Sequence, residues 1–480
     1  MFPSRTSLIP VQIALARFLE TNGWGAVFKN YPYWYLGTTP FRYLTGPIFP
    51  GLLVMVHKIL PNISLFEAVF LVLGLVWPLG AVGVYLLLRQ LGGKKSLALI
   101  AALLYFFGPL TVWLFSFSDG LSLIGSLTLP FVLYIYLRWL KQPSRTNITF
   151  CIISICFAIL LNSLMVPSLF LGMAAVLLAT TSWKKIEKKI KSSLLIIIYC
   201  LLITSLWYAP GYWWQVIIAP SFAGKSLFQV ISQLGQLLPI VLALSLAIVS
   251  SKSKNINHKT PVIKFTFYWL FIFGFLTLMR FIADPDFWLD WLAYGWELQL
   301  GLAVAIGLWV SRCWNSPSQA VSPRISFKLV LAGTAYCLLF TVIFKTRIID
   351  RFQQDITRSV EYRISYQLSK LMKPDERVFL SGSSVFWLNA FFDISQVRGG
   401  NDRASVDPDW RAAAWEIREG QEVNKTIKAL EDLGVSWLVV HTPASLELYH
   451  DFKYPEKFED VGGLEKVYDQ SGDRIYRVLP

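Results

Sequence analysis

Long apolar runs fill most of the chain between Ile48 and Phe344, and short polar gaps separate them. A membrane-spanning helix needs about 20 mostly apolar residues, so this stretch has room for about ten. We expect spanning helices at 64–88, 96–117, 121–140, 148–163, 166–182, 193–209, 227–250, 263–283, 298–313 and 326–344. A shorter run at 47–60 is interrupted by Pro47, Pro50, His57 and Lys58, which favours a re-entrant or interfacial helix.

The Lys and Arg residues between these runs cluster in alternate gaps. One set of gaps begins at Arg89, Arg138, Lys184, Lys252 and Arg312, and Glu187 is its only acid. The other set, at 116–119, 162–164, 209–225 and 283–297, is nearly free of Lys and Arg. By the positive-inside rule the first set is cytoplasmic and the second is exterior. The pattern therefore predicts a multi-pass protein of the cell membrane with residues 1–60 and 345–480 outside.

The composition changes after residue 345, where polar and charged residues become frequent. Alternating and buried-strand patterns predict strands at 377–382 and 435–441, and a terminal hairpin of 464–468 and 474–478. Helical patterns predict helices at 350–372, 424–433 (ended by Gly434) and 443–450. This order predicts a small exterior α/β domain.

The predicted fold is therefore an α-helical polytopic membrane protein with a C-terminal exterior α/β domain. Its predicted divisions are an exterior amphipathic helix and aromatic/proline loop at 1–62, a transmembrane bundle at 63–345 and the α/β domain at 346–480.

The N-terminal segment fits this topology less simply. Residues 8–20 have the pattern of an amphipathic helix lying on the membrane. An exterior N-terminus normally follows a first spanning helix or a signal peptide, and neither precedes Met1. We expect that the chain lacks a first helix present in its relatives, or that its start is placed too late.

The distribution of charged residues and of cysteines argues against several classes of function. The formal net charge is +14, but the positive residues lie between apolar runs, where they orient helices and meet lipid headgroups. This distribution argues against a nucleic-acid partner. The five cysteines all lie inside apolar runs without a CxxC pair, and the four histidines are scattered. No disulfide framework and no thiolate or histidine zinc site is predicted.

The segment Tyr31–Pro50 carries seven aromatic residues, four prolines and Arg42. One interpretation is an aromatic belt at the membrane interface. The other is a rigid loop that binds a sugar or a lipid headgroup, with Arg42 holding a phosphate through its two-pronged guanidinium. The sugar-binding candidates are Tyr33, Trp34, Tyr35 and Tyr43.

Acidic residues are rare near the exterior side of the membrane. Asp119 stands in a very short gap between two apolar runs, which indicates either a functional carboxylate or a turn former in Ser-Asp-Gly. Asp284 and Asp286 could hold a divalent cation or lie in a solvated loop. Arg280 and Lys225 are either snorkelling anchors or contacts to a donor phosphate. Glu20, Asp290 and Glu297 complete the acids on this side.

The order of these segments resembles the integral-membrane glycosyltransferases of the GT-C class. More narrowly, the chain is similar to a prokaryotic family of membrane proteins described as related to 6-pyruvoyl-tetrahydropterin synthase, although it has no three-histidine zinc set. The segments that carry the resemblance are Asn22–Gly25, Tyr31–Gly37, Val84–Arg89, Phe386–Asn389, Gln396–Asp402, Val440–Ser445 and Leu448–Phe452.

The resemblance implies transfer of a sugar from a polyprenyl-phosphate donor to an exterior cell-envelope glycan or protein. It also implies a catalytic Asp or Glu in the first exterior loop, but Phe2–Pro10 contains no acid, and Glu20 is the only carboxylate before Glu67. A general base needs a carboxylate within hydrogen-bond reach of its substrate. Asp119, or less directly Glu20, is therefore the acid/base candidate, with Arg42, Arg280 and Lys225 as phosphate contacts.

Two other functions remain open. A non-catalytic scaffold or glycan-binding protein for envelope assembly fits the missing first-loop acid. A lipid-linked glycan transporter would need charges within the spans and broken half-helices, and the spans are nearly free of charge. The enzyme hypothesis predicts an exterior cavity between the 31–50 loop, Asp119 and the loops 209–225 and 283–297, open to membrane lipid, donor and acceptor.

Overall fold

The structure is a computed structural model of the chain. It describes residues 9–108, 120–209, 212–213, 238–251, 259–283, 294–314, 335, 338, 339, 342, 345, 355–400, 405, 410–459 and 461–479. The chain forms two compact units, one made of Met1–Ala68 with Gln353–Pro480 and the other of Val69–Phe352. We call them the terminal unit and the bundle unit and describe each by itself. The two ends of the chain, separate segments in the sequence analysis, thus form one unit.

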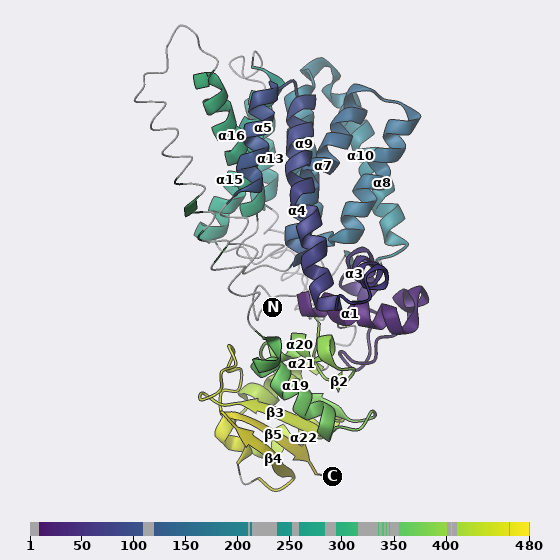
Figure 1. The fold of residues 1–480 in the computed structure, drawn as a ribbon, viewed down its shortest axis with the longest axis vertical. Coiled ribbons are helices and arrows are strands. Elements are labelled where there is room, and N and C mark those ends of the chain that lie inside the picture. Colours follow the sequence, from purple (N-terminus) through teal and green to yellow (C-terminus); the bar gives the residue numbers. More distant parts are fainter. Residues whose placement is uncertain are drawn as a thin grey trace. The chain divides into compact units, whose positions relative to one another are not determined.

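The bundle unit is a set of apolar helices (Figure 1). They are α4 (Leu65–Gln90, begun in the terminal unit), α5 (Lys95–Phe106), α7 (Gly120–Lys141), α8 (Arg145–Leu161), α9 (Val166–Thr180), α10 (Trp183–Ser205), α13 (Leu238–Ser251), α15 (Pro261–Ala283) and α16 (Gly295–Trp314). These helices follow nine of the ten predicted runs. The tenth, 326–344, lies almost wholly outside the described residues.

Three of the described helical segments are long and apolar enough to cross a membrane: Leu65–Gln90, Leu123–Lys141 and Pro261–Met279. Several of the other apolar helices are shorter, and α10 (23 residues) begins with a run of lysines, so ten spans remain a prediction. Glycines let neighbouring helices approach closely: a Cβ on Gly83 of α4 would lie 2.7 Å from the backbone nitrogen of Phe131 in α7. Small residues at such contacts are typical of helix packing in membranes.

The N-terminal part of the terminal unit is helical. It consists of α1 (Ile9–Asn22), the 3-10 helix η1 (Trp24–Phe28), α2 (Pro40–Tyr43), α3 (Ile48–Ile59) and the first turn of α4. Ser64 and Glu67 start α4 with a reciprocal capping pair, Ser64 N–H to Glu67 Oε2 at 2.7 Å and Glu67 N–H to Ser64 Oγ at 3.2 Å. Helix α1 differs from the prediction of a surface helix, because ten of its side chains, on all sides, are buried.

The C-terminal part is the predicted α/β fold. Its elements are η5 (Ile356–Arg358), α19 (Val360–Leu371), β1 (Arg377–Phe379), α20 (Ser384–Phe391), β2 (Ser395–Gln396), α21 (Trp410–Glu419), α22 (Val423–Asp432), β3 (Trp437–His441), η7 (Pro455–Phe458), β4 (Leu464–Gln470) and β5 (Asp473–Val478). Gly434 ends α22 as predicted: its φ is 62°, and Gly434 N–H and Val435 N–H bond Glu431 O at 2.8 Å and Leu430 O at 2.9 Å.

The five strands form one sheet in the order β2-β1-β3-β5-β4. Strands β1, β2 and β3 are parallel, whereas β5 is antiparallel to both β3 and β4. The predicted terminal hairpin is confirmed, and Ser471 and Gly472 form its turn with φ angles of 53° and 80°. Positive φ at both turn residues matches the right-handed twist of the strands.

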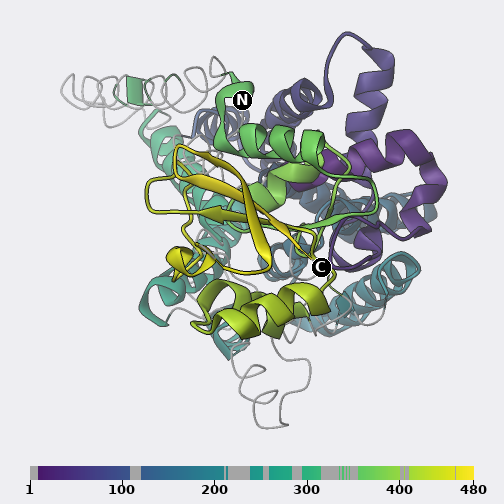
Figure 2. The same ribbon diagram turned by 90° about the horizontal axis from the view of Figure 1, so that it is seen from below.

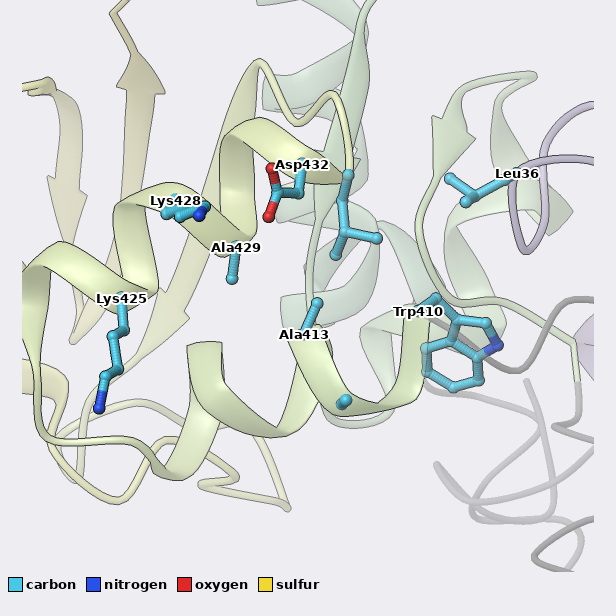
Figure 3. A pocket seen from close by; sticks show the side chains of 9 residues that line it. Leu36, Trp410, Ala413, Lys425, Lys428, Ala429 and Asp432 are labelled. Atoms are coloured by element: carbon cyan, nitrogen blue, oxygen red, sulfur yellow. The ribbon is translucent and has the colours of Figure 1, made fainter. Parts of the chain in front are cut away.

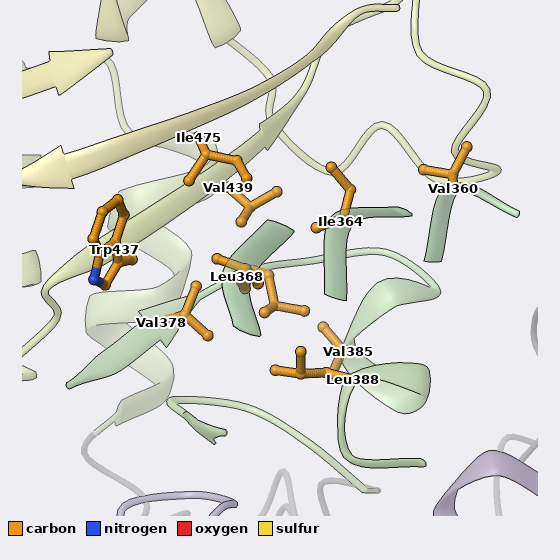
Figure 4. Close-up of a cluster of buried hydrophobic side chains, with 10 residues drawn as sticks. Val360, Ile364, Leu368, Val378, Val385, Leu388, Trp437, Val439 and Ile475 are labelled. Carbon is orange, nitrogen blue, oxygen red and sulfur yellow. The ribbon is translucent and has the colours of Figure 1, made fainter. Parts of the chain in front are cut away.

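Helices cover both faces of this sheet. On one face, Ile364 and Leu368 of α19 and Leu388 of α20 pack against Val378 and Val439 (Figure 4). Aromatic contacts line the other face, with ring centroids of Phe379 and Phe452 6.3 Å apart and those of Phe458 and Tyr476 6.2 Å apart. Figure 2 shows the yellow strands between the green helix α19 and the yellow-green helices α21 and α22.

The predicted helix at 443–450 is wrong, because this segment is a series of turns after β3. Side chains take the backbone groups that a helix would use: Ser445 Oγ accepts Glu447 N–H at 2.9 Å, and Glu447 Oε1 accepts Leu448 N–H at 2.9 Å. Such local side-chain bonds compete with helix formation. The predicted helix at 350–372 is described only as η5 and α19.

Candidate functional site

A cavity of about 390 Å³ lies in the terminal unit between α1, the end of α3 and the start of α4. Its polar lining comes from Arg17, Glu20, Thr21, His57 and Ser64, and Ala390 of α20 contributes to the wall. We call it the Glu20 cavity. It brings Glu20, one of the two acid/base candidates from the sequence, into a concave site beside His57, which the sequence indicated only as an interruption of an apolar run.

Glu20 and His57 face each other in this cavity. His57 Nε2 lies 3.4 Å from Glu20 Oε1, and His57 Nδ1 lies 2.5 Å from the carbonyl oxygen of Ile63. A carbonyl oxygen only accepts, so Nδ1 carries a hydrogen and Nε2 faces the carboxylate. The contact between His57 Nε2 and Glu20 Oε1 is attractive when one hydrogen lies between these two atoms. Such a pair can take a proton from, or return it to, a bound hydroxyl.

Arg17 does not point freely into the cavity. Its Nη1 donates to the carbonyl oxygen of Phe391 at 2.6 Å, and its Nη2 lies 3.5 Å from Asp393 Oδ1. These contacts attach α1 to the end of α20. Arg17 therefore stabilises the wall of the Glu20 cavity, and one carboxylate already offsets its charge.

Asn389 joins the aromatic loop to the α/β fold. Its Oδ1 accepts hydrogen bonds from Trp34 Nε1 at 2.9 Å and from Gln396 Nε2 at 2.7 Å. Its Nδ2 donates to Phe392 O at 3.2 Å and to Ile394 O at 2.8 Å. Both the oxygen and the nitrogen of the side-chain amide therefore have hydrogen-bond partners, and Asn389 has no exposed surface. We call this set of contacts the Asn389 network.

Gly399 and Gly400 leave room for the indole ring of Trp34. A Cβ on Gly399 would lie 2.0 Å from Trp34 Cδ1, and one on Gly400 would lie 2.8 Å from Trp34 Cε3. Both residues have positive φ, 130° and 52°, which glycine adopts without strain. The backbone N–H of Gln396 also donates to Tyr33 O at 3.0 Å. Three of the segments that suggested the resemblance therefore meet here.

This packing limits the predicted sugar-binding set. Trp34 and Tyr35 are 0% and 1% exposed, so no ring face is open to a sugar, and Tyr35 packs against Trp410 with centroids 5.0 Å apart. Tyr33 and Tyr43 keep partial exposure. Arg42 lies at the end of α2, and its buried Nε has no hydrogen-bond partner among the described residues.

Several predicted site residues lie outside the described residues. These are Asp119, Lys225, Asp284 and Asp286, and the side chain of Arg280 in α15 also falls outside. The expected cavity between the 31–50 loop, Asp119 and the loops 209–225 and 283–297 is therefore not described. Within the described residues, no group of three His, Cys, Asp or Glu side chains could hold a metal ion.

Among the described residues of the bundle unit, Glu297 is a buried acid that the sequence suggested only as an exterior residue. Glu297, in the first turn of α16, is 5% exposed and has a hydrogen bond from Ser168 of α9. Its position at the edge of the apolar run 298–313 is the only sequence signal for this burial. An ionisable residue among apolar helices is a functional candidate by default.

Asp473 is the centre of a second polar network in the terminal unit. Its Oδ1 accepts from His441 Nδ1 at 2.7 Å and from Ser445 Oγ at 2.5 Å, and its Oδ2 pairs with Arg363 Nη2. Burial alone would raise the pKa of Asp473, but the hydrogen bonds from His441, Ser445 and Arg363 bring it below its ordinary value of 3.8. Asp473 and His441 are fully buried, so this network serves the fold.

A second hollow of about 520 Å³ lies between α21 and α22, on the surface of the terminal unit (Figure 3). Trp410 forms one end, and Lys425, Lys428 and Asp432 of α22 line the other. Small side chains, Ala413 and Ala429, form its floor. An apolar floor with charged groups at one rim can accept a polar ligand with one apolar face.

No protein-family model matches the chain, and no curated protein matches its sequence. Solved structures do match. The cryo-EM structure of the arabinofuranosyltransferase AftD from Mycobacteria gives a TM-score of 0.58 at 15% identity, covering 99% of this chain and 38% of AftD. A mutant form of AftD gives a TM-score of 0.56 at 16% identity, covering 100% of this chain and 40% of that one.

The archaeal oligosaccharyltransferase AglB from Archaeoglobus fulgidus, solved with an inhibitory peptide and a dolichol-phosphate, is also similar. Its TM-score is 0.53 at 13% identity, covering 98% of this chain and 70% of AglB. The likeness to these two glycosyltransferases spans nearly all of this chain and concerns the fold. The protein therefore has a GT-C-like fold, with apolar membrane helices and a small sheet domain. The comparisons do not show the narrower pterin-synthase-related family.

Proposed function

We propose that the protein is a GT-C-like glycosyltransferase that transfers a sugar from a polyprenyl-phosphate donor to an exterior cell-envelope acceptor. The observation that carries the proposal is the whole-chain likeness in fold to AftD and AglB. At these identities the likeness concerns the fold, and this chain spans less than half the length of AftD. The donor, the acceptor and the activity therefore belong to the proposal.

Two carboxylates are the acid/base candidates in this proposal. Asp119, at the boundary of an apolar run, is the first, and Glu20 is the second. Glu20 has the geometry for the role, since it lines a cavity and contacts His57 at 3.4 Å. Arg42, Arg280 and Lys225 would bind the donor phosphate, Tyr33 and Tyr43 would contact the sugar, and Asp284 with Asp286 would hold a divalent cation if one is required.

The acceptor would bind to the terminal unit. The hollow between α21 and α22 combines an apolar floor with Lys425, Lys428 and Asp432, which can hydrogen-bond a glycan. In this arrangement residues 345–480 are exterior and Lys184–Lys191 are cytoplasmic, as the alternation of positive charge favours.

A non-catalytic scaffold is the second candidate, and one observation favours it. Trp34 and Tyr35, half of the predicted sugar-binding set, are buried in packing with the α/β fold. Aromatic residues that serve packing do not bind a donor sugar, so their burial favours a rigid binding platform over an enzyme.

Transfer of radiolabelled sugar from a panel of polyprenyl-phosphate donors tests the proposal, using purified full-length protein in nanodiscs with cell-envelope glycan as acceptor. We expect turnover by the wild type. We expect Asp119→Asn or Glu20→Gln to lower the rate by on the order of 10²–10⁴-fold, because the amide cannot take the acceptor proton. Arg42→Ala should weaken donor binding, because the phosphate loses a charged, bidentate partner.

Glu465→Gln is the matched control, since Glu465 is an exposed carboxylate on β4 far in sequence from both candidates. Its rate should equal that of the wild type. Unchanged rates in both acid variants would remove Asp119 and Glu20 from the role. Lack of turnover by the wild type, with retained glycan binding, would establish the scaffold instead.

A further inference from the structure

Helix α3 has an exposed apolar stripe. Leu52, Met55, Val56 and Ile59 stand at positions i, i+3, i+4 and i+7 and therefore share one side of the helix. Met55 and Ile59 are 49% and 67% exposed, and Leu52 and Val56 are partly exposed. Four apolar side chains in one row on a protein surface indicate a contact with an apolar environment.

The other side of α3 is already buried in the terminal unit. Phe49 and Leu53 have no exposed surface. The helix is thus apolar on both sides, and its only charged or polar side chains are His57 and Lys58 in the last turn. A surface helix in water normally has a polar outer side, whereas a helix that is apolar all round is buried in protein or lipid.

Two exposed aromatic side chains belong to the 3-10 helix η1, and one of them lies against α3. Trp24 and Phe28 of η1 are 61% and 60% exposed. The indole of Trp24 lies against α3, because a Cβ on Gly51 would be 2.4 Å from Trp24 Cη2. We call Trp24, Leu52, Met55, Val56 and Ile59 the α3 patch. Tryptophan with lysines at the rim, here Lys29 and Lys58, is the composition found at membrane–water interfaces.

Chain continuity identifies what covers this patch. Helix α3 ends at Ile59, and α4, an apolar segment long enough to cross a membrane, begins at Leu65. The intervening residues can span at most about 20 Å even when fully extended. The first turn of α4 belongs to the same unit as α3. The patch therefore lies close to the point where the chain enters the hydrocarbon.

We propose that the α3 patch is a membrane anchor, inserted into the interfacial region of the bilayer. It is independent of the proposed transferase function. His57 of the Glu20 cavity lies in the same turn of α3 as Met55 and Ile59. The anchor therefore fixes the depth of the Glu20 cavity relative to the lipid headgroups.

Spin labels on the full-length protein test the anchor. Met55→Cys and Ile59→Cys, each in a background with the five native cysteines replaced, are labelled and placed in nanodiscs of phosphatidylcholine and phosphatidylglycerol. Power-saturation EPR then compares relaxation by oxygen, which concentrates in lipid, with relaxation by a water-soluble nickel chelate. We expect oxygen to dominate by several-fold at both positions, since both side chains meet the acyl chains.

Glu465→Cys on β4 is the control, because Glu465 is an exposed, charged position. The nickel chelate should dominate there. Nickel-dominated relaxation at positions 55 and 59 would show a patch in water and overturn the proposal. Low accessibility to both reagents would show a patch covered by protein, including a second copy of the chain, and would also overturn it.

Discussion

Replacing Asp473 with Asn is expected to destabilise the terminal unit by about 3 kcal/mol, because one partner of a buried charge network loses its charge. One carboxylate oxygen of Asp473 accepts hydrogen bonds from His441 and Ser445, and the other pairs with Arg363. Asparagine has the same shape but only one acceptor oxygen. Its NH₂ group must therefore face either the His441 and Ser445 donors or the Arg363 donor. The buried imidazole or the Arg363 guanidinium is then left without an acceptor.

Hydrogen exchange measured on peptides from β3 and β5 of the full-length protein checks this prediction. Asp469→Asn is the matched control: Asp469 is the same residue type on the adjacent strand β4, but it is 41% exposed and its partners are Lys466 at 3.0 Å and Arg474 at 3.3 Å. Exposed pairs contribute at most about 1 kcal/mol. Equal effects of the two substitutions would contradict a special role for the Asp473 network.

The same network makes the stability depend on pH with a defined sign. The pKa of Asp473 is lower in the folded state than its ordinary value of 3.8: burial alone would raise it, but the bonds from His441, Ser445 and Arg363 bring it down. The folded state therefore favours the carboxylate, and this contribution is fully present above the unfolded pKa. It is lost as the pH falls below about 4 towards the folded pKa. Asp473→Asn should lose part of the stability change that the wild type shows in this range.

Replacing Asn389 with Leu should detach the aromatic loop from the α/β fold. The substitution leaves Trp34 Nε1 and the carbonyl groups of Phe392 and Ile394 without their partner, whereas Gln396 Nε2 keeps Val385 O at 3.0 Å. Each buried polar group left unsatisfied costs about 1–3 kcal/mol. We expect a loss on the order of 3 kcal/mol, seen as a roughly hundred-fold drop in hydrogen-exchange protection at 31–37 and 394–397.

Asn424→Leu is the control for this substitution, because Asn424 lies exposed on α22 and leucine is a good helix former. It should leave protection unchanged. Asn389→Asp should also lose protection, since its second carboxylate oxygen would face the carbonyl oxygens of Phe392 and Ile394 with no hydrogen to donate. Full protection at 31–37 in Asn389→Leu would show that the loop is held by other contacts.

Local signals in the sequence were sufficient for much of the fold. The apolar runs predicted the helices of the bundle unit, and for α4 and α15 they predicted both ends to within a few residues. The glycine after 424–433 predicted the end of α22, and alternation around Ser471 predicted the β4–β5 hairpin. These features depend on neighbours within one element, which is why periodicity and turn chemistry indicate them.

Contacts between distant residues were not predictable in this way. Trp34 bonds Asn389 across 355 positions, and Arg17 bonds Phe391 across 374. Nothing in the local pattern of Tyr31–Gly37 distinguishes an aromatic side chain that binds a ligand from one that fills a core. His57 gave no signal as a partner of Glu20 either, because helices α1 and α3 meet only in the tertiary fold.

The terminal unit is assembled from the first and the last parts of the chain. A ribosome produces about 5–20 residues per second, so α1 is made tens of seconds before the strands that complete its unit. Throughout that time Ile9–Ala16 of α1, buried in the finished protein, have no α20 to pack against. The bundle helices are translated and inserted during this interval. Biogenesis must therefore shield the first segment until α20 is released, and a chain stopped before α20 would leave α1 as a target for proteolytic quality control.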